Sequence, residues 1–149
     1  MPRRLFVALA LVSTLAIACD KAESDALPSV RLGMSPRDVR DRFEPGASGS
    51  WQTRVGVGDD TVLEWNARPA ARARIVDARF EFHLGMLVAV RAHLEDPVAK
   101  DSISVTARTV THRAPREGGV GSSVTILARD CPTHREEAEG LAARAARGR

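Results

Sequence analysis

The segment from Ile75 to Leu94 constrains the fold more than any other part of the chain, because its apolar residues recur at every second position. Alternation with this period is typical of strands that bury one face and leave the other in water. The apolar residues that alternate are Val76, Ala78, Phe80 and Phe82 in the first half and Val88, Val90, Ala92 and Leu94 in the second. The pattern predicts a β-hairpin that lies centrally in a sheet, with Phe80 and Phe82 buried.

The same pattern selects the length of the hairpin loop. A three-residue loop, His83-Leu84-Gly85, pairs Phe82 with Met86 and brings the apolar residues of both strands to one face. A two-residue loop at Gly85-Met86 would instead place a phenylalanine opposite Arg91. Glycine also suits the left-handed position that ends a three-residue loop. We therefore predict the three-residue loop.

Shorter segments with strand patterns lie on either side of this hairpin. We expect further strands at 51–57, 61–66, 102–113 and 123–129, with a possible bulge near Val110, where the alternation breaks. Strands therefore come in runs, and no strand–helix–strand alternation is seen. That order is typical of an antiparallel sheet, which we expect to contain about four to six strands.

Two segments carry signals for helices. Ser35 can cap a helix, Pro36 suits the first helical position, and Asp38 lies three residues after the cap. Near the C-terminus, Thr133 and Glu136 have the spacing of a capping box. The stripe that follows at helical spacing consists of His134, Ala138, Leu141 and Ala145. We therefore predict an α+β domain whose N-terminal and C-terminal helices pack on one face of the sheet.

The first 18 residues have the features of a secretory leader. Arg3 and Arg4 precede an apolar run from Leu5 to Ala18, which is too short to span a membrane but has the length of a leader core. The sequence Leu15-Ala16-Ile17-Ala18 before Cys19 resembles a bacterial lipobox. We therefore expect Cys19 to be the first residue of the mature protein and to carry lipid. The alternative is an ordinary leader whose cleavage leaves Cys19 unmodified.

The expected lipid determines the organisation and the compartment. Residues 1–18 form the signal peptide, residues 19–29 a flexible tether and residues 30–149 a single α+β domain. The chain then lies in the bacterial cell envelope, held on the membrane through Cys19 and facing the periplasm. Asp20 resembles an inner-membrane retention signal of enteric bacteria, and the choice between inner and outer membrane stays open.

Charge and cysteine content limit the possible partners and cofactors. Without Arg3 and Arg4 the mature chain is nearly neutral, and together with export this argues against a nucleic-acid partner. Cys131 and His134 have the spacing of two zinc ligands, but a site would need two more. A buried cysteine beside a boundary histidine is the favoured interpretation. We therefore predict no metal site, no cofactor and no catalytic residue.

Two motifs resemble a known family. Gly33–Phe43 reads GMSPRDVRDRF, in the form GMSxxxVxxxF, and Phe80–Val90 reads FEFHLGMLVAV, in the form FxFxxGxLVxV. With the strand Val62–Asn66 between them, they resemble the BamE/SmpA–OmlA group of small bacterial lipoproteins, whose fold is shared with the β-lactamase inhibitor protein. The resemblance covers about residues 30–94. It implies that fold and a tendency to bind other proteins, the group's best-known role being accessory to outer-membrane β-barrel assembly.

Two classes of function follow. The first is a membrane-anchored, non-catalytic module that binds or assembles another envelope protein. Trp51 and Trp65 are its expected interaction surface, since aromatic side chains are enriched at interfaces. The alternative is that both tryptophans belong to the core, which applies most to Trp65 because it shares its strand face with Leu63. The alternative function is a small periplasmic enzyme or thiol protein that uses Cys131. An exposed Cys131 with a lowered pKa would favour this alternative function.

Overall fold

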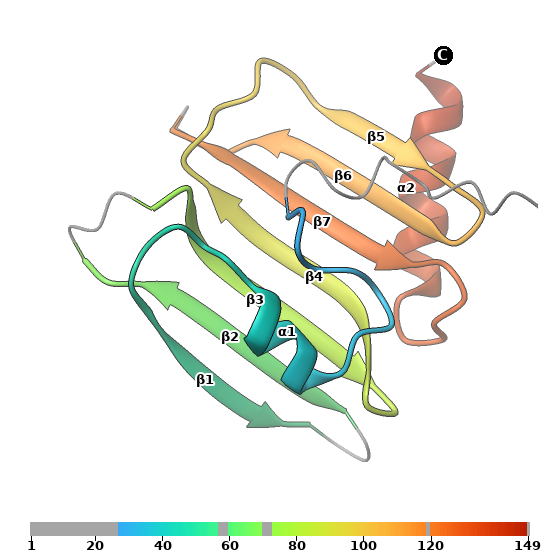
Figure 1. The fold of residues 1–149 in the computed structure, drawn as a ribbon. Coiled ribbons are helices and arrows are strands. Elements are labelled where there is room, and N and C mark those ends of the chain that lie inside the picture. Colours follow the sequence, from blue (N-terminus) through green and yellow to red (C-terminus); the bar gives the residue numbers. More distant parts are fainter. Residues whose placement is uncertain (1–26, 57–59, 70–72, 119, 149) are drawn as a thin grey trace, which may run out of the picture.

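The computed structural model describes residues 27–56, 60–69, 73–118 and 120–148, which form one antiparallel sheet of seven strands and two helices (Figure 1). The elements are α1 (Pro36–Arg42), β1 (Gly49–Val55), β2 (Thr61–Ala67), β3 (Ile75–His83), β4 (Met86–Leu94), β5 (Ser102–Val105), β6 (Thr109–Pro115), β7 (Ser122–Ala128) and α2 (Arg135–Arg147). The order across the sheet is β1-β2-β3-β4-β7-β6-β5. The predicted α+β class and the central position of the β3–β4 hairpin are confirmed, whereas the predicted strand number is too low.

The additional strand arises where one strand was predicted over residues 102–113. The side-chain oxygen of Thr106 accepts hydrogen bonds from the backbone N–H groups of Arg108 and Thr109, at 3.2 and 3.0 Å. Bonds of this kind stabilise a turn. The chain therefore reverses, and Val105 of β5 pairs with Val110 of β6. The break in alternation that we interpreted as a possible bulge is a hairpin turn.

The predicted three-residue loop between β3 and β4 is wrong. His83 is the last residue of β3 and pairs with Met86, so the turn consists of Leu84 and Gly85 alone. Their φ angles are 51° and 74°. Positive φ at both central positions is the pattern of a type I′ turn, whose twist matches that of the adjoining strands.

A β-bulge then brings the apolar residues back into phase. Phe82 pairs with Leu87 and Phe80 pairs with Val90, so that one extra residue, Val88, is accommodated in β4. Phe80 and Phe82 are buried, as predicted. Val88, which we expected on their face, is replaced there by Leu87.

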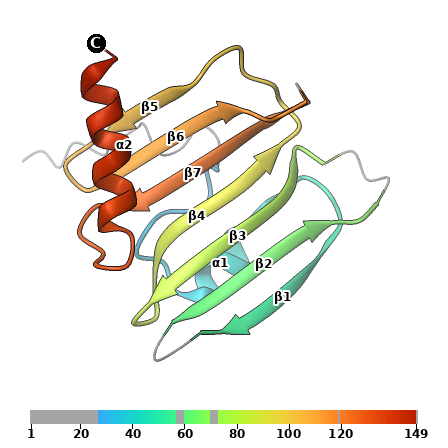
Figure 2. The ribbon, with the colours of Figure 1, turned by 180° about the vertical axis from the view of Figure 1, so that it is seen from behind.

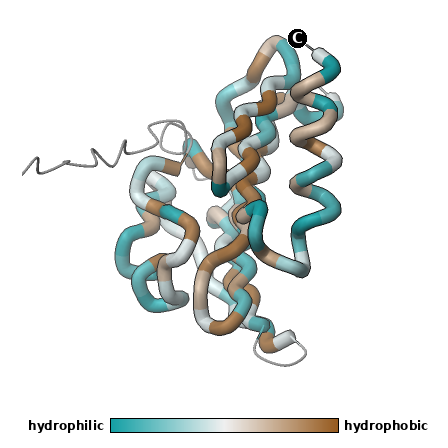
Figure 3. The backbone as a smooth tube through the Cα atoms, turned by 90° about the vertical axis from the view of Figure 1, so that its right-hand side faces the viewer, coloured by the Kyte–Doolittle hydropathy of each residue, from teal (hydrophilic) through white to brown (hydrophobic). Residues whose placement is uncertain are grey.

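The two helices lie on opposite faces of the sheet, and the prediction of one shared face is wrong. Helix α1 is in front of β2 and β3 in Figure 1, whereas α2 is in front in the reverse view of Figure 2. The side view of Figure 3 shows the sheet between them. Val39 of α1 packs into the core around Phe80, and Ala138 of α2 packs against Ala89 and Leu127. The sheet therefore has two apolar clusters, one on each face.

The domain begins earlier than predicted. Leu27 and Val30 are buried in the core that contains α1, so at least residues 27–29 belong to the folded domain and not to the expected tether. The backbone of this segment also joins the sheet, because Gly33 N donates to Leu87 O at 2.8 Å and Leu87 N donates to Met34 O at 2.8 Å. Cys19 and the expected signal peptide lie outside the described residues.

Of the two helix caps predicted, the structure confirms the one at α1 and contradicts the one at α2. At α1 the capping box is present, since Asp38 N donates to Ser35 Oγ and Ser35 N donates to the Asp38 carboxylate. At α2 the residue before the first turn is His134, and no side chain caps the helix, so the capping box predicted at Thr133 is wrong.

Within the described ranges, no helix is both long enough and apolar enough to cross a membrane.

Candidate functional site

The two tryptophans predicted to form an interaction surface lie on the face covered by α1. Trp51 and Trp65 pair across β1 and β2, and both rings make edge contacts with Phe43, with ring centroids 5.5 Å apart. Trp65 is only 3% exposed, so the alternative that places it in the core holds and it cannot form part of an interaction surface. Trp51 is half-buried, and the guanidinium of Arg40 lies over its ring at 5.7 Å.

Cys131 is also buried, with 5% of its surface exposed. This burial and that of His134 agree with the favoured interpretation of the pair. The exposure that the thiol alternative required is absent. Among the described residues, no cluster of three or more His, Cys, Asp or Glu side chains is arranged to hold a metal ion.

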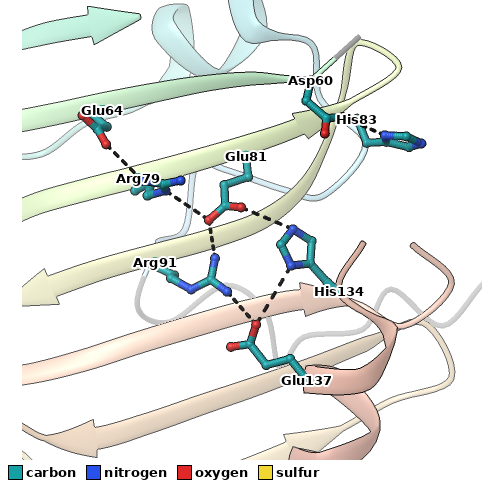
Figure 4. Close-up of polar contacts among 8 residues, drawn as sticks. All are labelled: Asp60, Glu64, Arg79, Glu81, His83, Arg91, His134 and Glu137. Carbon is teal, nitrogen blue, oxygen red and sulfur yellow. Dashed lines mark hydrogen bonds and ion pairs between the residues drawn. The ribbon is translucent and has the colours of Figure 1, made fainter. Parts of the chain in front are cut away.

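A polar network lies on the other face of the sheet, beside the start of α2 (Figure 4). Glu81 is at its centre, and its Oε1 atom accepts hydrogen bonds from Arg91 Nη1 and, at 3.1 Å, from Arg79 Nε. Its other oxygen, Oε2, is 3.4 Å from Nε2 of His134. A largely buried carboxylate is thus surrounded by three basic side chains, which compensate for its loss of hydration.

The network joins the sheet to α2. Arg91 Nη2 also donates to Glu137 Oε2 in the first turn of the helix, at 2.6 Å, and His134 Nδ1 lies 4.0 Å from the same oxygen. A carboxylate at this position also suits the positive end of the helix dipole. The ring of His134 therefore contacts Glu81 and Glu137 and does not cap the helix backbone.

A cavity of about 190 Å³ adjoins the network. Its lining includes Glu81 and His134 together with a second carboxylate–imidazole pair, in which Asp60 Oδ1 and His83 Nδ1 are 2.8 Å apart. Sequence reasoning treated the polar residues of β3 as a solvated face. Their alternation along the strand was the available signal, but only the folded chain brings His134 beside Glu81.

A second hollow shares one lining residue of β4 with this cavity. Val88 lines both, and the second hollow, of about 340 Å³, is also lined by Leu32, Met86 and Leu87. Leu84 and Met86 project from the turn with 62% and 52% of their surfaces exposed. We call residues 84–88 with this second hollow the hairpin end.

Leu84 is the least expected residue of the hairpin end. Its φ of 51° is left-handed, a conformation that suits Gly or Asn and is unfavourable for a residue with a large side chain. Its exposed side chain recovers little of that cost by burial. We therefore take Leu84, which is unfavourable both in conformation and in exposure, as a candidate binding residue.

Comparison with known proteins adds no relative. No protein-family model, no curated protein and no solved structure matches the chain. We therefore base the function on the hairpin end and on the leader-like N-terminus.

Proposed function

We propose that the chain is a lipid-anchored protein of the bacterial cell envelope, and that its domain binds another envelope protein through the hairpin end without chemistry of its own. The observation that carries this proposal is Leu84, an exposed leucine held at a positive φ on a two-residue turn. We do not adopt the thiol alternative, because Cys131 is buried.

The surroundings of Leu84 have the composition of an interface. Met86 is exposed next to the hollow, whose apolar lining can accept a side chain of the partner. Arg108 and Asp130 also line the hollow and supply polar groups. Apolar anchors combined with polar groups are typical of surfaces where proteins associate.

The expected anchor supports the same function. A lipid on Cys19 would confine the domain to the membrane surface, where the effective concentration of a membrane-bound partner is high. The resemblance to the BamE/SmpA–OmlA group adds to the proposal, since that group works through protein contacts. The resemblance itself stays a prediction.

Site-specific photo-crosslinking in living cells tests the proposal. A photoreactive residue at Met86 of the full chain should yield a defined envelope partner. In that background, Leu84→Asn should reduce the crosslink by about tenfold or more, the loss expected for a central interface residue. The matched control is Val120→Asn, which changes another exposed apolar residue (76%) on the β6–β7 loop, at the opposite end of the sheet.

Two outcomes would contradict the proposal. One is an unchanged crosslink in the Leu84→Asn protein. The other is recovery of the same partner when the photoreactive residue is placed at Val120. Either result would show that the hairpin end does not determine the contact.

A further inference from the structure

We propose that two copies of this chain pair through β1, so that their sheets join antiparallel into one continuous sheet. The inference rests on the edge of the described domain, and it does not depend on the partner proposed for the hairpin end. Strands β1 and β5 are the two edges of the sheet (Figure 1).

The free edge of β1 offers hydrogen-bonding groups at alternate residues. Gly56 N donates to Asp60 O at 2.8 Å, and Arg68 N donates to Ser48 O at 3.0 Å, so even-numbered residues face β2. Because backbone groups alternate in direction along a strand, the odd-numbered residues direct their N–H and C=O groups outward. These residues are Gly49, Trp51, Thr53 and Val55.

This edge lacks the features that usually prevent strand pairing. The seven residues pair with β2 in an unbroken register, without a bulge, and they include neither proline nor lysine. The one charged residue is Arg54, whose guanidinium lies 3.2 Å from Glu64 on β2. Trp51 is held against Phe43 in the core. The edge is therefore regular, nearly uncharged and anchored.

The opposite edge is protected. Strand β5 has only four residues. Asp101, which precedes it, accepts a hydrogen bond from Arg144 of α2 at 2.7 Å and lies 3.3 Å from Nε2 of His112. A short edge flanked by charges is a poor template for pairing. Pairing through β1 alone closes with two copies and does not continue into a filament.

The strand is complementary to itself when the two-fold axis passes through Gln52. In this register Gly49 lies opposite Val55 of the second copy, and Trp51 lies opposite Thr53. All four outward-facing residues of each copy then form hydrogen-bonded pairs. If the two-fold axis passed through Trp51 or Thr53 instead, one of these four outward-facing residues would have no partner in the second copy.

Side chains on both faces fit this register. Val55 is 80% exposed, and the position it would face is a glycine whose missing Cβ would lie 2.4 Å from the ring of Trp65. The ring of Trp65 thus occupies the space of the missing side chain, and Val55 of each copy would lie beside Gly49 and this ring in the other copy. On the opposite face Arg54 meets Ser50, so no like charges lie directly opposite each other.

Pairing of two seven-residue strands is a small interface, and we expect a dimer that depends on concentration. Confinement to a membrane raises the effective concentration of both copies. The inference is best tested with the full chain in membranes, where that concentration is set by the protein's own location.

Disulfide trapping measures the register directly. At the two-fold axis the Cα atoms of the two Gln52 residues would be about 4.5 Å apart, within the range that a disulfide can bridge. Under mild oxidation, Gln52→Cys should form at least about tenfold more linked dimer than the parent chain, which supplies the background of Cys19 and Cys131. The matched control is Ser50→Cys, on the same face, whose two copies would be separated by about 13 Å. A mixture of Ser50→Cys and Arg54→Cys chains should form the linked dimer again.

A second substitution separates pairing from folding. Val55→Asp would place a carboxylate against the second copy and should reduce the Gln52→Cys dimer about tenfold. Val120→Asp changes an apolar residue of similar exposure and should leave the yield unchanged. Equal yields from Gln52→Cys and Ser50→Cys in folded protein would overturn the proposal, as would an unchanged yield with Val55→Asp. Crosslinking from Met86 reports separately on the hairpin end.

Discussion

Phe43 shows how a single side chain connects separate parts of this core. It lies at the C-terminal cap of α1, and its ring makes edge contacts with Trp51 of β1, Trp65 of β2 and Phe80 of β3. Edge-to-face contacts of this kind contribute beyond the area they bury. The aromatic cluster therefore joins α1 to three neighbouring strands.

Replacement of Phe80 tests this cluster. The side chain is fully buried and contacts Phe43, so Phe80→Ala should lower the free energy of unfolding by about 3–5 kcal/mol. Denaturant unfolding followed by tryptophan fluorescence measures the change. Val120→Ala, at an exposed position, should stay within about 0.5 kcal/mol of the parent. A loss below about 1 kcal/mol for Phe80→Ala would mean that the cluster is not packed as described.

For Leu84 we expect the opposite sign of effect, because its replacement by asparagine should stabilise the domain. Asparagine followed by Gly85 is the preferred sequence for a type I′ turn. We expect Leu84→Asn to raise the free energy of unfolding by about 1 kcal/mol, the scale of the left-handed penalty that leucine bears. Thermal and urea unfolding measure it. A destabilised variant would show that leucine contributes contacts that outweigh its conformation.

At the scale of elements, α2 is attached to the sheet by contacts of two kinds. Ala138 packs against Ala89 and Leu127, and ion pairs lie near both ends of the helix. Near the start Glu137 pairs with Arg91, and near the end Arg144 pairs with Asp101. Ala138 is the only buried residue that α2 contributes among those described, so we expect these ion pairs to help hold the helix on the sheet.

The pair at the far end makes the attachment sensitive to pH. Hydrogen bonding to His112, and then to Arg144, holds the pKa of Asp101 below its usual value. A carboxyl with a depressed pKa in the folded state stabilises the fold at neutral pH, and that contribution is lost as the pH falls through the folded-state pKa. Because Asp101 is about half exposed, we expect less than about 1 kcal/mol from it.

Comparison of the parent with Asp101→Asn tests this dependence. Urea unfolding at pH 6 should show a lower free energy of unfolding for the variant. As the pH is lowered further the difference between the two proteins should narrow, because the parent's carboxylate becomes protonated and its stabilising contribution is lost. A difference that stays constant from pH 6 to pH 2 would exclude Asp101 as the titrating group.

At the scale of the whole molecule, the decisive prediction concerns the anchor. We expect Cys19→Ala to release the protein from the membrane fraction, because the acyl chains would be lost. Membrane fractionation measures the release, and mass spectrometry of the parent should find a lipid-modified N-terminal peptide that begins at Cys19. A Cys19→Ala protein that stays as firmly bound as the parent would refute lipid anchoring at this residue.

The sequence by itself determined those features whose signals are local. The capping box at Ser35 and Asp38 lies within four residues of chain, and it forms as predicted. Alternation over nine-residue strands identified the central hairpin and the burial of Phe80 and Phe82. Each of these signals lies within one segment of the chain, but a local signal is not sufficient, since the same capping-box spacing at Thr133 and Glu136 does not form a cap.

Only the tertiary structure decided two kinds of feature: contacts between residues distant in the chain, and a strand register in which a bulge offsets the effect of a shorter turn. The turn at Leu84 and a bulge at Val88 together give nearly the same buried face as the longer loop that we predicted, so periodicity alone could not separate them. The side chains that meet Glu81 come from β3, β4 and the start of α2. Burial of Trp65 follows from the packing of α1, and the opposite placement of α2 follows from the second apolar cluster around Ala89. These contacts join residues far apart in the chain, and only packing brings them together.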